Sequence, residues 1–412
     1  MKKVKNLNLV ITYIIVVLMI VDSNSIFMTG IAASLLRKFG MLLMAIVVWS
    51  LSSRVEHSNR DYKNYIVTLL EISTYLLIYI LFISLRVGRE SLKASLIIFI
   101  KFVLMYTLVD LVYKKEKDPQ IFNVYNNTVC IIALISIFFW IFGSQLHVLH
   151  PTGVYSSSWS NLYGGYDSKP TYYNIYFETQ LLHNVVRNSA IFAEAPMAAL
   201  TFSVALTLEN LYGKKSKFHK LKLLVFTIAI LTTLSSTGYI CLIINLIYLL
   251  LINTSQSKYK SLLRGTILLV GIIIVVCIFI EKLHSHSGSS RGQDYRNAFL
   301  AVKKHPFFGV GFGNGFKLKG GIGKFGYSNS FGKVIGEGGI YISILYWLAF
   351  AKSFFVALKN KNLQRLFFTI IIVFLFITTI FVDSYLMCFL LALLAFWQPT
   401  RKMELVENEK KN

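Results

Sequence analysis

Long apolar runs separated by short, lysine-rich segments are the dominant pattern of this chain of 412 residues. Runs such as 264–280 and 366–382 approach the length at which a helix crosses a hydrocarbon core of about 30 Å. The pattern predicts an all-α, polytopic integral membrane protein with about 12 transmembrane helices. The second or the twelfth could be re-entrant, which makes the expected number about 10 to 12.

We expect these spans at successive places along the chain. They lie near 8–24, 39–53, 64–84, 94–113, 121–143, 190–211, 221–236, 238–252, 265–281, 331–351, 366–382 and 384–398. Two long polar loops remain, 144–189 and 282–330. Since no separate soluble domain is attached, residues 1–412 are expected to form a single transmembrane domain.

The distribution of Lys and Arg predicts the orientation of the spans. With the N-terminus inside, the cytoplasmic segments contain 25 Lys and Arg residues, and the external segments other than 282–330 contain 7. Short cytoplasmic loops are enriched in Lys and Arg. We therefore expect both termini in the cytoplasm and both long loops on the external side of the cytoplasmic (inner) membrane.

The composition adds limits on partners. Hydrophobic residues make up 55% of the chain, and the formal net charge is +23. In a soluble chain this charge would suggest nucleic acid, but here it is mostly the ordinary orientation signal, so no nucleic-acid partner is expected. The four cysteines are isolated inside apolar runs, and neither a disulfide nor a metal site is implied.

The loop 282–330 departs from the charge pattern, because short external loops normally contain few Lys and Arg. It holds one acid, Asp294, and has a net charge of +7. Its basic residues are Lys282, Arg291, Arg296, Lys303, Lys304, Lys317, Lys319 and Lys324. A cationic loop on the external side predicts an anionic, membrane-bound ligand, with a lipid-linked pyrophosphate as the leading candidate.

Within this loop, residues 294–304 have the apolar spacing of an amphipathic helix. Its apolar face would carry Tyr295, Ala298, Phe299 and Val302. Arg291 precedes this helix, where a guanidinium could hold phosphate oxygens together with the helix N-terminus.

The loop 144–189 is rich in aromatic residues, among them Tyr155, Tyr172 and Tyr176. Such residues usually anchor a protein at the membrane interface, but aromatic surfaces also stack on sugar rings. Both interpretations stay open.

This loop ends at Arg187, where the sixth span is expected to enter the membrane. Glu194, seven residues later, would lie two helical turns further on the same face and deeper in the bilayer. Ionisable groups at depth tend to line polar cavities, and Pro196 suggests a broken helix at that point. The alternative for Arg187 is that it only reaches the lipid head groups.

Two glycine-rich stretches do not fit nucleotide binding. Residues 309–315 have GxGxGxG spacing instead of the dinucleotide fingerprint. In the second stretch, 320–325, no Ser or Thr follows Lys324 as a P-loop requires. We expect a tight loop that permits close approach of the backbone.

The last motif begins at Ser328 and Asn329. Ser and Asn before a helix are first of all N-caps, which predicts that a helix starts here. Glu337 would lie inside the following apolar run between glycines, and a membrane-buried carboxylate is a functional candidate, as an acid or base or as the partner of an arginine.

Four segments in this order resemble the O-antigen polymerase and ligase superfamily, the integral-membrane enzymes of bacterial surface polysaccharide assembly. They are RNSAIFAEAP at 187–196, LSSTGY at 234–239, SSR with KKHPFFGVGFGNGF within 289–316, and SNSFGKVIGEGG at 328–339. The N-terminal spans match only as generic hydrophobic helices.

The resemblance implies metal-independent glycosyl transfer, with external arginines that hold the pyrophosphate of a polyprenyl-linked donor. Arg187 matches the arginine before the sixth span, and Arg291 matches the arginine that opens the large loop. Family members, ligases especially, often carry a histidine where this chain has Ser328. A histidine base is therefore not transferred, and Glu337 or His305 would have to serve, or the arginines suffice by polarising the leaving group.

We therefore expect a glycosyltransferase that polymerises lipid-linked oligosaccharide repeat units for capsule, O-antigen or exopolysaccharide, without a cofactor. The missing histidine favours a polymerase over a ligase. A flippase or transporter and a non-catalytic assembly partner are further alternatives, although charge concentrated in one loop argues against transport. Expected partners are the polyprenyl-pyrophosphate-linked oligosaccharide, membrane lipid, a chain-length regulator and a flippase. The candidate catalytic residues are Arg187, Arg291 and Glu337, and the candidate substrate-binding residues are Arg296, Glu194, His305, Asn329 and Lys304.

Overall fold

The computed structural model describes residues 2–29, 33–52, 59–87, 89–115, 120–157, 167–213, 217–253, 286–314 and 327–396, with scattered residues between 265 and 280. Within these ranges the chain is mostly helical, as the apolar runs predicted. The expected span 265–281 is described only at scattered residues. Lys282, Lys317, Lys319 and Lys324 lie outside the described residues.

The helices begin and end close to the expected places. They are α1 (Lys2–Asp22), α2 (Ala33–Ser52), α3 (Asn59–Val87), α4 (Arg89–Lys115), α5 (Gln120–Phe139), α6 (Ala195–Tyr212), α7 (His219–Thr232), α8 (Ser236–Asn253), α10 (His286–Lys304), α11 (Ser330–Lys359), α12 (Leu363–Thr378) and α13 (Tyr385–Phe396). A 3-10 turn, η1 (Ile26–Met28), follows α1, and a π-helical turn, η2 (Trp140–Gln145), extends α5.

Within the described residues, five helical segments are long and apolar enough to cross a membrane. They are Ala33–Leu51, Tyr65–Arg86, Ser91–Leu111, Gln120–Gln145 and Ser330–Lys359. Four shorter apolar helices are Leu9–Asp22, Ser236–Ile252, Leu363–Thr378 and Tyr385–Ala395. Large apolar side chains of α2 and α3 are exposed, which suits a surface that lipid covers. Twelve spans and cytoplasmic termini stay predictions.

The central helix is α6, because almost every one of its residues is buried. It packs against α5, α7, α8 and α12. Near its C-terminal end the buried Glu209 accepts a hydrogen bond from Asn126 Nδ2 (2.8 Å) and lies 3.0 Å from His219 Nδ1. Since α6 is enclosed on all sides, its packing determines where the segment before Ala195 lies.

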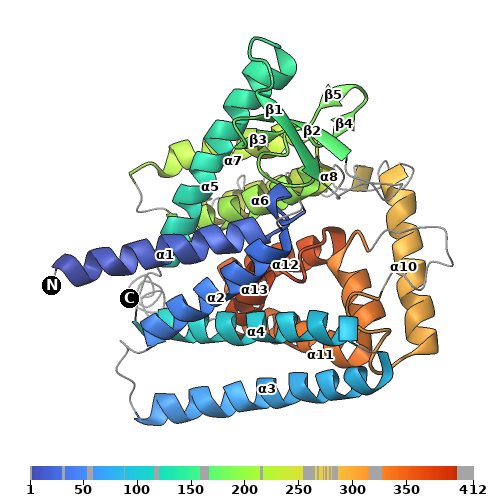
Figure 1. Ribbon diagram of the computed structural model, residues 1–412. Helices are drawn as coiled ribbons and strands as arrows, with labels where there is room; N and C mark the ends of the chain where they lie inside the picture. Colours follow the sequence, from blue (N-terminus) through green and yellow to red (C-terminus); the bar gives the residue numbers. More distant parts are fainter. Residues whose placement is uncertain are drawn as a thin grey trace.

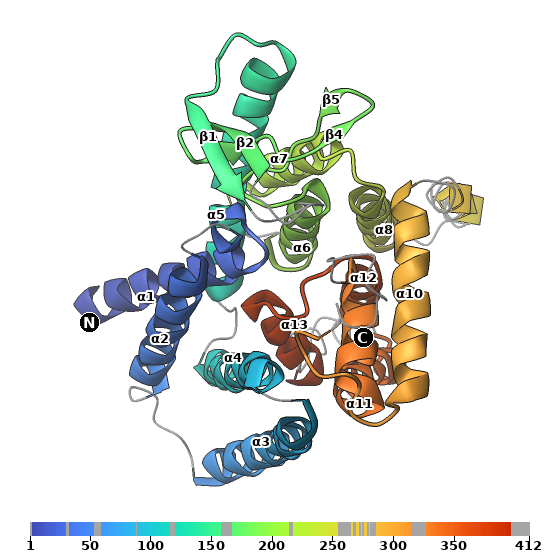
Figure 2. The same ribbon diagram turned by 45° about the vertical axis from the view of Figure 1, so that its right-hand side comes forward.

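Helix α10 crosses one end of the bundle (Figure 1). Helices α3 and α4 run side by side toward it in Figure 1. In both Figure 1 and Figure 2, α1 begins on the opposite side of the molecule from α10. Here Asn24 Nδ2 donates to the carbonyl of Ile380 (2.6 Å), and the Tyr295 hydroxyl donates to that of Ile377 (2.9 Å). These bonds join the segment after α1 and helix α10 to the end of α12 and the connection that follows it. We call this end of the bundle, which α10 crosses, the α10 end.

The segment 144–189 folds into two small sheets, which the all-α expectation missed. The strands β1 (Gly153–Ser157), β2 (Asp167–Tyr172) and β3 (Tyr176–Phe177) form one antiparallel sheet, and β4 (Leu181–Leu182) and β5 (Val185–Val186) form a hairpin. Tyr172 and Tyr176 are buried against Phe139, at centroid separations of 5.5 and 6.1 Å. These two tyrosines therefore hold the sheet against α5. Such short strands carry too little alternation to be recognised in the sequence.

Candidate active site

Arg187 is held at the α10 end by the turn between α7 and α8. Its Nε donates to the carbonyl of Thr233 (3.0 Å), its Nη2 to that of Leu234 (3.1 Å), and its Nη1 to Gln180 Oε1 (3.2 Å). Leu234 has a φ of +48°, the left-handed conformation that often ends a helix. Carbonyls at a helix C-terminus favour a cation. A guanidinium has five N–H groups, so these three bonds leave donors for a ligand.

Glu194 begins α6 instead of lying within a helix. It is the N-cap of α6 with extended backbone, and the residues between Arg187 and Glu194 are not helical, so the expected separation of two helical turns is wrong. Pro196 lies in the first turn of α6, where proline is favoured, and it does not break a helix. Gln180 Oε1 also accepts a hydrogen bond from the amide of Ala195 (3.1 Å). This amide side chain therefore ties Arg187 to the start of α6.

Arg291 lies inside α10 and does not precede it, because the helix begins at His286. The buried face of α10 carries Asp294, Asn297, Ala298 and Ala301. The expected apolar face was partly wrong, since Phe299 is 58% exposed. The helix is rotated so that Asp294 reaches the start of α11, a polar contact that apolar spacing does not predict.

Arg187, Glu194 and Arg291 lie close enough for their charges to act on one another. Burial lowers the pKa of Arg187, the charge of Glu194 opposes this, and the charge of Arg291 lowers the pKa further. Burial also lowers the pKa of Arg291, while Tyr295 and Glu194 oppose this. Arginine stays charged in proteins, so two guanidinium groups and the Glu194 carboxylate lie within range of one another's charge at the α10 end.

Asp294 connects α10 to the start of α11. Its Oδ2 accepts hydrogen bonds from the backbone amide of Ser328 (2.7 Å) and from the Ser328 hydroxyl (2.6 Å). Asp294 is 3% exposed, whereas Ser328 is exposed. The spacing of residues along the chain did not predict this pair. The available signal was that Asp294 is the single acid of the basic loop 282–330.

Asn329 is the N-cap of α11, as expected. Its Oδ1 accepts a hydrogen bond from the amide of Gly332 (2.7 Å). The next residue, Ser330, donates its hydroxyl to the carbonyl of Thr379 (2.8 Å) and accepts from the amide of Phe381 (2.9 Å). These contacts hold the start of α11 against the connection between α12 and α13.

Helix α11 is broken at Gly339, and the glycine-rich loop fills the break. Gly339 has φ +68° and ψ −170°, a conformation open essentially only to glycine. On one side the carbonyls of Gly336 and Glu337 accept from loop amides, and on the other the amides of Ile340 and Tyr341 donate to loop carbonyls. Their partners are Val310 (3.1 Å), Gly311 (2.8 Å), Pro306 (2.9 Å) and Phe307 (2.9 Å). The expected close approach of the glycine-rich backbone is confirmed.

Glu337 lies in the short part of α11 before this break. Its Oε2 accepts a hydrogen bond from the amide of Gly313 (3.0 Å), and the residue is 2% exposed. The part that follows, 340–359, has about 20 residues and can by itself cross a hydrocarbon core of about 30 Å. Glu337 lies inside the candidate span Ser330–Lys359, as expected, two residues before the break at Gly339. It packs against the glycine-rich loop.

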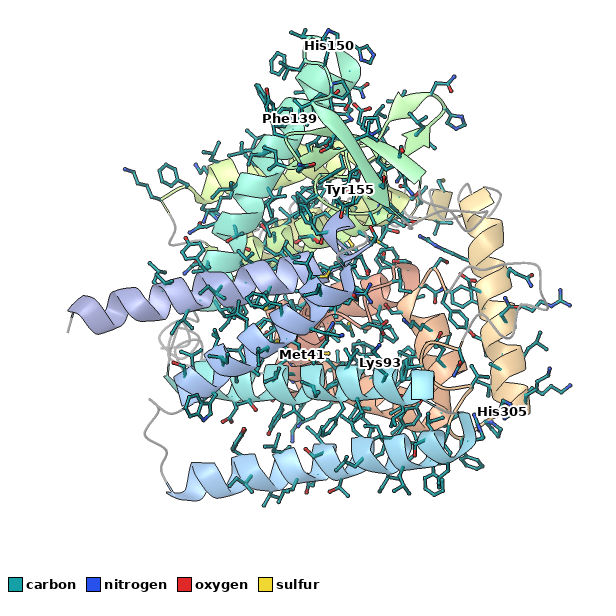
Figure 3. The ribbon with its side chains drawn as sticks, viewed as in Figure 1. Met41, Lys93, Phe139, His150, Tyr155 and His305 are labelled. Atoms are coloured by element: carbon teal, nitrogen blue, oxygen red, sulfur yellow. The ribbon has the colours of Figure 1, made fainter. Side chains whose placement is uncertain are left out.

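Lys304 and His305 lie at the C-terminal end of α10, far from the sheets (Figure 3). About 20 Å of helix separates Lys304 from Arg291. Arg86, at the end of α3, donates a hydrogen bond to the carbonyl of Gly309. Burial, together with the charges of Arg86 and Lys304, lowers the pKa of His305. The candidate residues Arg291 and Lys304, both from the loop 282–330, therefore lie near opposite ends of α10.

The chemistry at the α10 end comes from Arg187, Arg291, Glu194 and the Asp294–Ser328 pair. Arg296 is exposed on α10 and lies two positions from the buried Asp294, which turns it toward a different face of the helix. Within the described residues, no three His, Cys, Asp or Glu side chains come together as a metal ion would require. Paired guanidinium groups can bind a phosphate-type anion in a bidentate manner and stabilise negative charge that develops on it.

The long apolar helices with exposed apolar faces, and the polar site at one end of the bundle, define a multi-pass membrane protein. Residues 221–347 match a family model described as O-antigen ligase. This match confirms the resemblance to the O-antigen polymerase and ligase superfamily and indicates a ligase or polymerase type of function in surface polysaccharide synthesis. A search of the curated proteins finds no match.

Proposed function

We propose that the protein polymerises oligosaccharide repeat units carried on a polyprenyl pyrophosphate, at the external face of the cytoplasmic membrane. The polymer would be a capsule, an O-antigen or an exopolysaccharide. The donor is the growing chain, and the acceptor is a hydroxyl group on the terminal sugar of a second lipid-linked unit. A chain-length regulator and a flippase are the partners that such an enzyme would need.

The observation that supports this proposal most is that Arg187, fixed by the turn between α7 and α8, lies within range of the charges of Glu194 and Arg291. The two arginines come from distant parts of the chain, and like charges repel unless a counter-charge lies between them. Glu194 acts on both guanidinium groups, and Asp294 also acts on Arg291. A pyrophosphate would add contacts of its own, because each guanidinium can bind phosphate oxygens in a bidentate manner.

In the proposed reaction the acceptor hydroxyl attacks the anomeric carbon of the donor. The bond from that carbon to the pyrophosphate oxygen breaks, and both electrons leave with the pyrophosphate. Arg187 and Arg291 stabilise the charge that develops on the departing group. Electrostatic donors of this kind contribute about 3–4 kcal/mol each to lowering a barrier.

A ligase that transfers finished polymer to a different acceptor is the second candidate, favoured by the description of the matching family. The serine at position 328 favours the polymerase, because the resemblance associates ligases with a histidine there. Incubation of the purified protein with lipid-linked oligosaccharide separates the two. A ladder of products identifies a polymerase, and transfer only to an added foreign acceptor identifies a ligase.

The role of the arginines is tested by Arg291→Ala. We expect normal folded yield but a rate lower by about 100-fold or more, since a donor to the developing charge is lost. Lys303→Ala is the matched control, because Lys303 is an exposed cation of the same helix, and its rate should equal that of the unaltered protein. Normal long-chain product from Arg291→Ala would reject the proposed function of this site.

A further inference from the structure

Ser328 and Asp294 form a hydroxyl–carboxylate pair that the reaction above does not use. The Ser328 hydroxyl donates to Asp294 Oδ2 over 2.6 Å. The carboxylate is buried and the serine is exposed. A hydroxyl that donates its own proton keeps lone pairs for a second donor. A proton that arrives at the exposed serine oxygen can therefore pass to the buried carboxylate.

This pair lies beside Arg291. Asp294 is three residues after Arg291, so their Cβ atoms are about 5–6 Å apart on one face of α10, and the charge of Asp294 acts on Arg291. The other candidate bases are less well placed. Glu337 packs against the glycine-rich loop at Gly313, and His305 follows the far end of α10, about 20 Å from Arg291.

Two buried amide groups adjoin the pair. Among the described residues, none accepts a hydrogen bond from Nδ2 of Asn297 or from Nδ2 of Asn329, although both residues are buried. Asn297 is one turn after Asp294 on the same face of α10, and Asn329 directly follows Ser328. An unpaired buried donor costs about 1–3 kcal/mol. The hydroxyl oxygens of a sugar are acceptors of the kind that these amides lack.

We propose that Asp294, acting through Ser328, is the general base that takes the proton of the attacking sugar hydroxyl. This inference rests on the proposed function. As the hydroxyl oxygen bonds to the anomeric carbon, its proton moves to Ser328 Oγ, and the Ser328 proton moves to Asp294 Oδ2. The pyrophosphate leaves with the electrons of the broken bond, and Asp294 then releases its proton to solvent.

The test measures initial rates of transfer by the purified full-length protein, with lipid-linked oligosaccharide as substrate, as a function of pH. Asp294→Asn keeps the size of the side chain and an oxygen that accepts from Ser328, but it does not take up a proton. We expect a rate at least about 100-fold lower, without the acid limb of the pH profile, because a general base contributes about 100- to 10,000-fold. Binding of the radiolabelled lipid-linked donor should be unchanged.

Two further variants separate the relay from a structural role of Asp294, whose carboxylate also holds the Ser328 amide. Ser328→Thr keeps the hydroxyl and should keep the rate, whereas Ser328→Ala should lower it by about 10-fold or more. The titratable groups that face Asp294 are Arg291 and Tyr295 on α10 and Tyr327 before α11. Tyr295→Phe and Tyr327→Phe should leave the acid limb in place.

Glu178→Gln is the matched control for the Asp294 variant. Its Oε1 also accepts from a serine hydroxyl, that of Ser144 (2.8 Å), but within the sheet region packed on α5. This variant should keep both the rate and the acid limb.

The outcomes distinguish this inference from the function on which it rests. No product from the unaltered protein would overturn the proposed function. If the unaltered protein is active, and Asp294→Asn has a transfer rate within about threefold of it with the acid limb intact, the assignment of Asp294 as general base is wrong while the proposed function stands. A loss of rate in Asp294→Asn that equals its loss of donor binding would also overturn the general base, because it would show a purely structural role.

Discussion

A Cβ atom on Gly309 would lie 2.5 Å from the backbone carbonyl oxygen of Glu337. Gly309 also has a φ of +58°, which disfavours any residue with a side chain. The loop after α10 and the broken helix α11 are therefore in direct backbone contact. The hydrogen bonds that satisfy the break at Gly339 depend on that contact.

Gly309→Ala is expected to destabilise the protein strongly. The clash is with backbone and the conformation is strained, which together cost about 3 kcal/mol or more. The melting temperature in detergent measures the effect. Gly292→Ala is the control, because Gly292 lies within α10 and a Cβ atom there would meet nothing within 4 Å. This variant should melt at the same temperature as the unaltered protein or slightly higher, since alanine favours a helix over glycine. Equal melting temperatures for the two variants would contradict the backbone contact.

Arg187→Lys and Arg291→Lys should differ in stability. A lysine at position 187 does not reproduce the planar fork that reaches Thr233, Leu234 and Gln180. We expect Arg187→Lys to lower the transfer rate and also the free energy of unfolding, the latter by about 1–3 kcal/mol. Arg291→Lys should lower the rate alone, because none of the described residues accepts a hydrogen bond from its guanidinium.

Transfer rates and melting temperatures of Arg187→Lys and Arg291→Lys test this difference between the two arginines. Equal losses of stability would show that Arg187 is no more structural than Arg291.

Lys101 and Asp22 form a buried ion pair that joins α4 to α1. The Nζ atom lies 2.7 Å from Asp22 Oδ2, and each side chain is 8% exposed. Lys101→Met leaves the buried carboxylate without its counter-charge, and this should cost about 3–5 kcal/mol of stability. Asp22→Asn combined with Lys101→Met should recover part of the loss. A double-mutant cycle measures the coupling, and additive losses within about 0.5 kcal/mol would argue against a coupled pair.

His305 predicts a pH dependence of stability. Its pKa in the folded protein lies below the ordinary value of 6.5, because burial, Arg86 and Lys304 all disfavour its charged form. The folded state thus binds the proton less readily than the unfolded state. The contribution is fully present above the unfolded pKa and is lost as the pH falls through the folded-state pKa.

His305→Gln should therefore reduce the fall in melting temperature between about pH 8 and pH 5. His150→Gln, at an exposed histidine of the loop 144–189, is the control and should leave that fall as it is. An unchanged fall in the His305 variant would contradict the assignment.

Several local features followed from residue types alone. The N-cap at Asn329 and the close backbone approach at Gly309 were predicted, because Asn and Gly have distinctive local chemistry. The non-helical course of 187–194 was not predicted, because the sequence offers no local signal for the turn at Ala190, where φ is +50°, or for the hydrogen bonds of this segment to β3 and the end of α7. Proline at position 196 is consistent with both a broken helix and a first turn, and only the observed backbone distinguishes them.

The sequence by itself determined a helical membrane protein with an unusual basic loop, because long uncharged runs suit lipid and local residue chemistry governs caps and tight turns. Which ionisable groups meet was decided only by the tertiary structure. The rotation of α10 turns Asp294 toward Ser328, and the glycine-rich loop brings the amide of Gly313 to Glu337. Both depend on hydrogen bonds between segments far apart in the chain, and the spacing of residues along a chain does not encode such contacts.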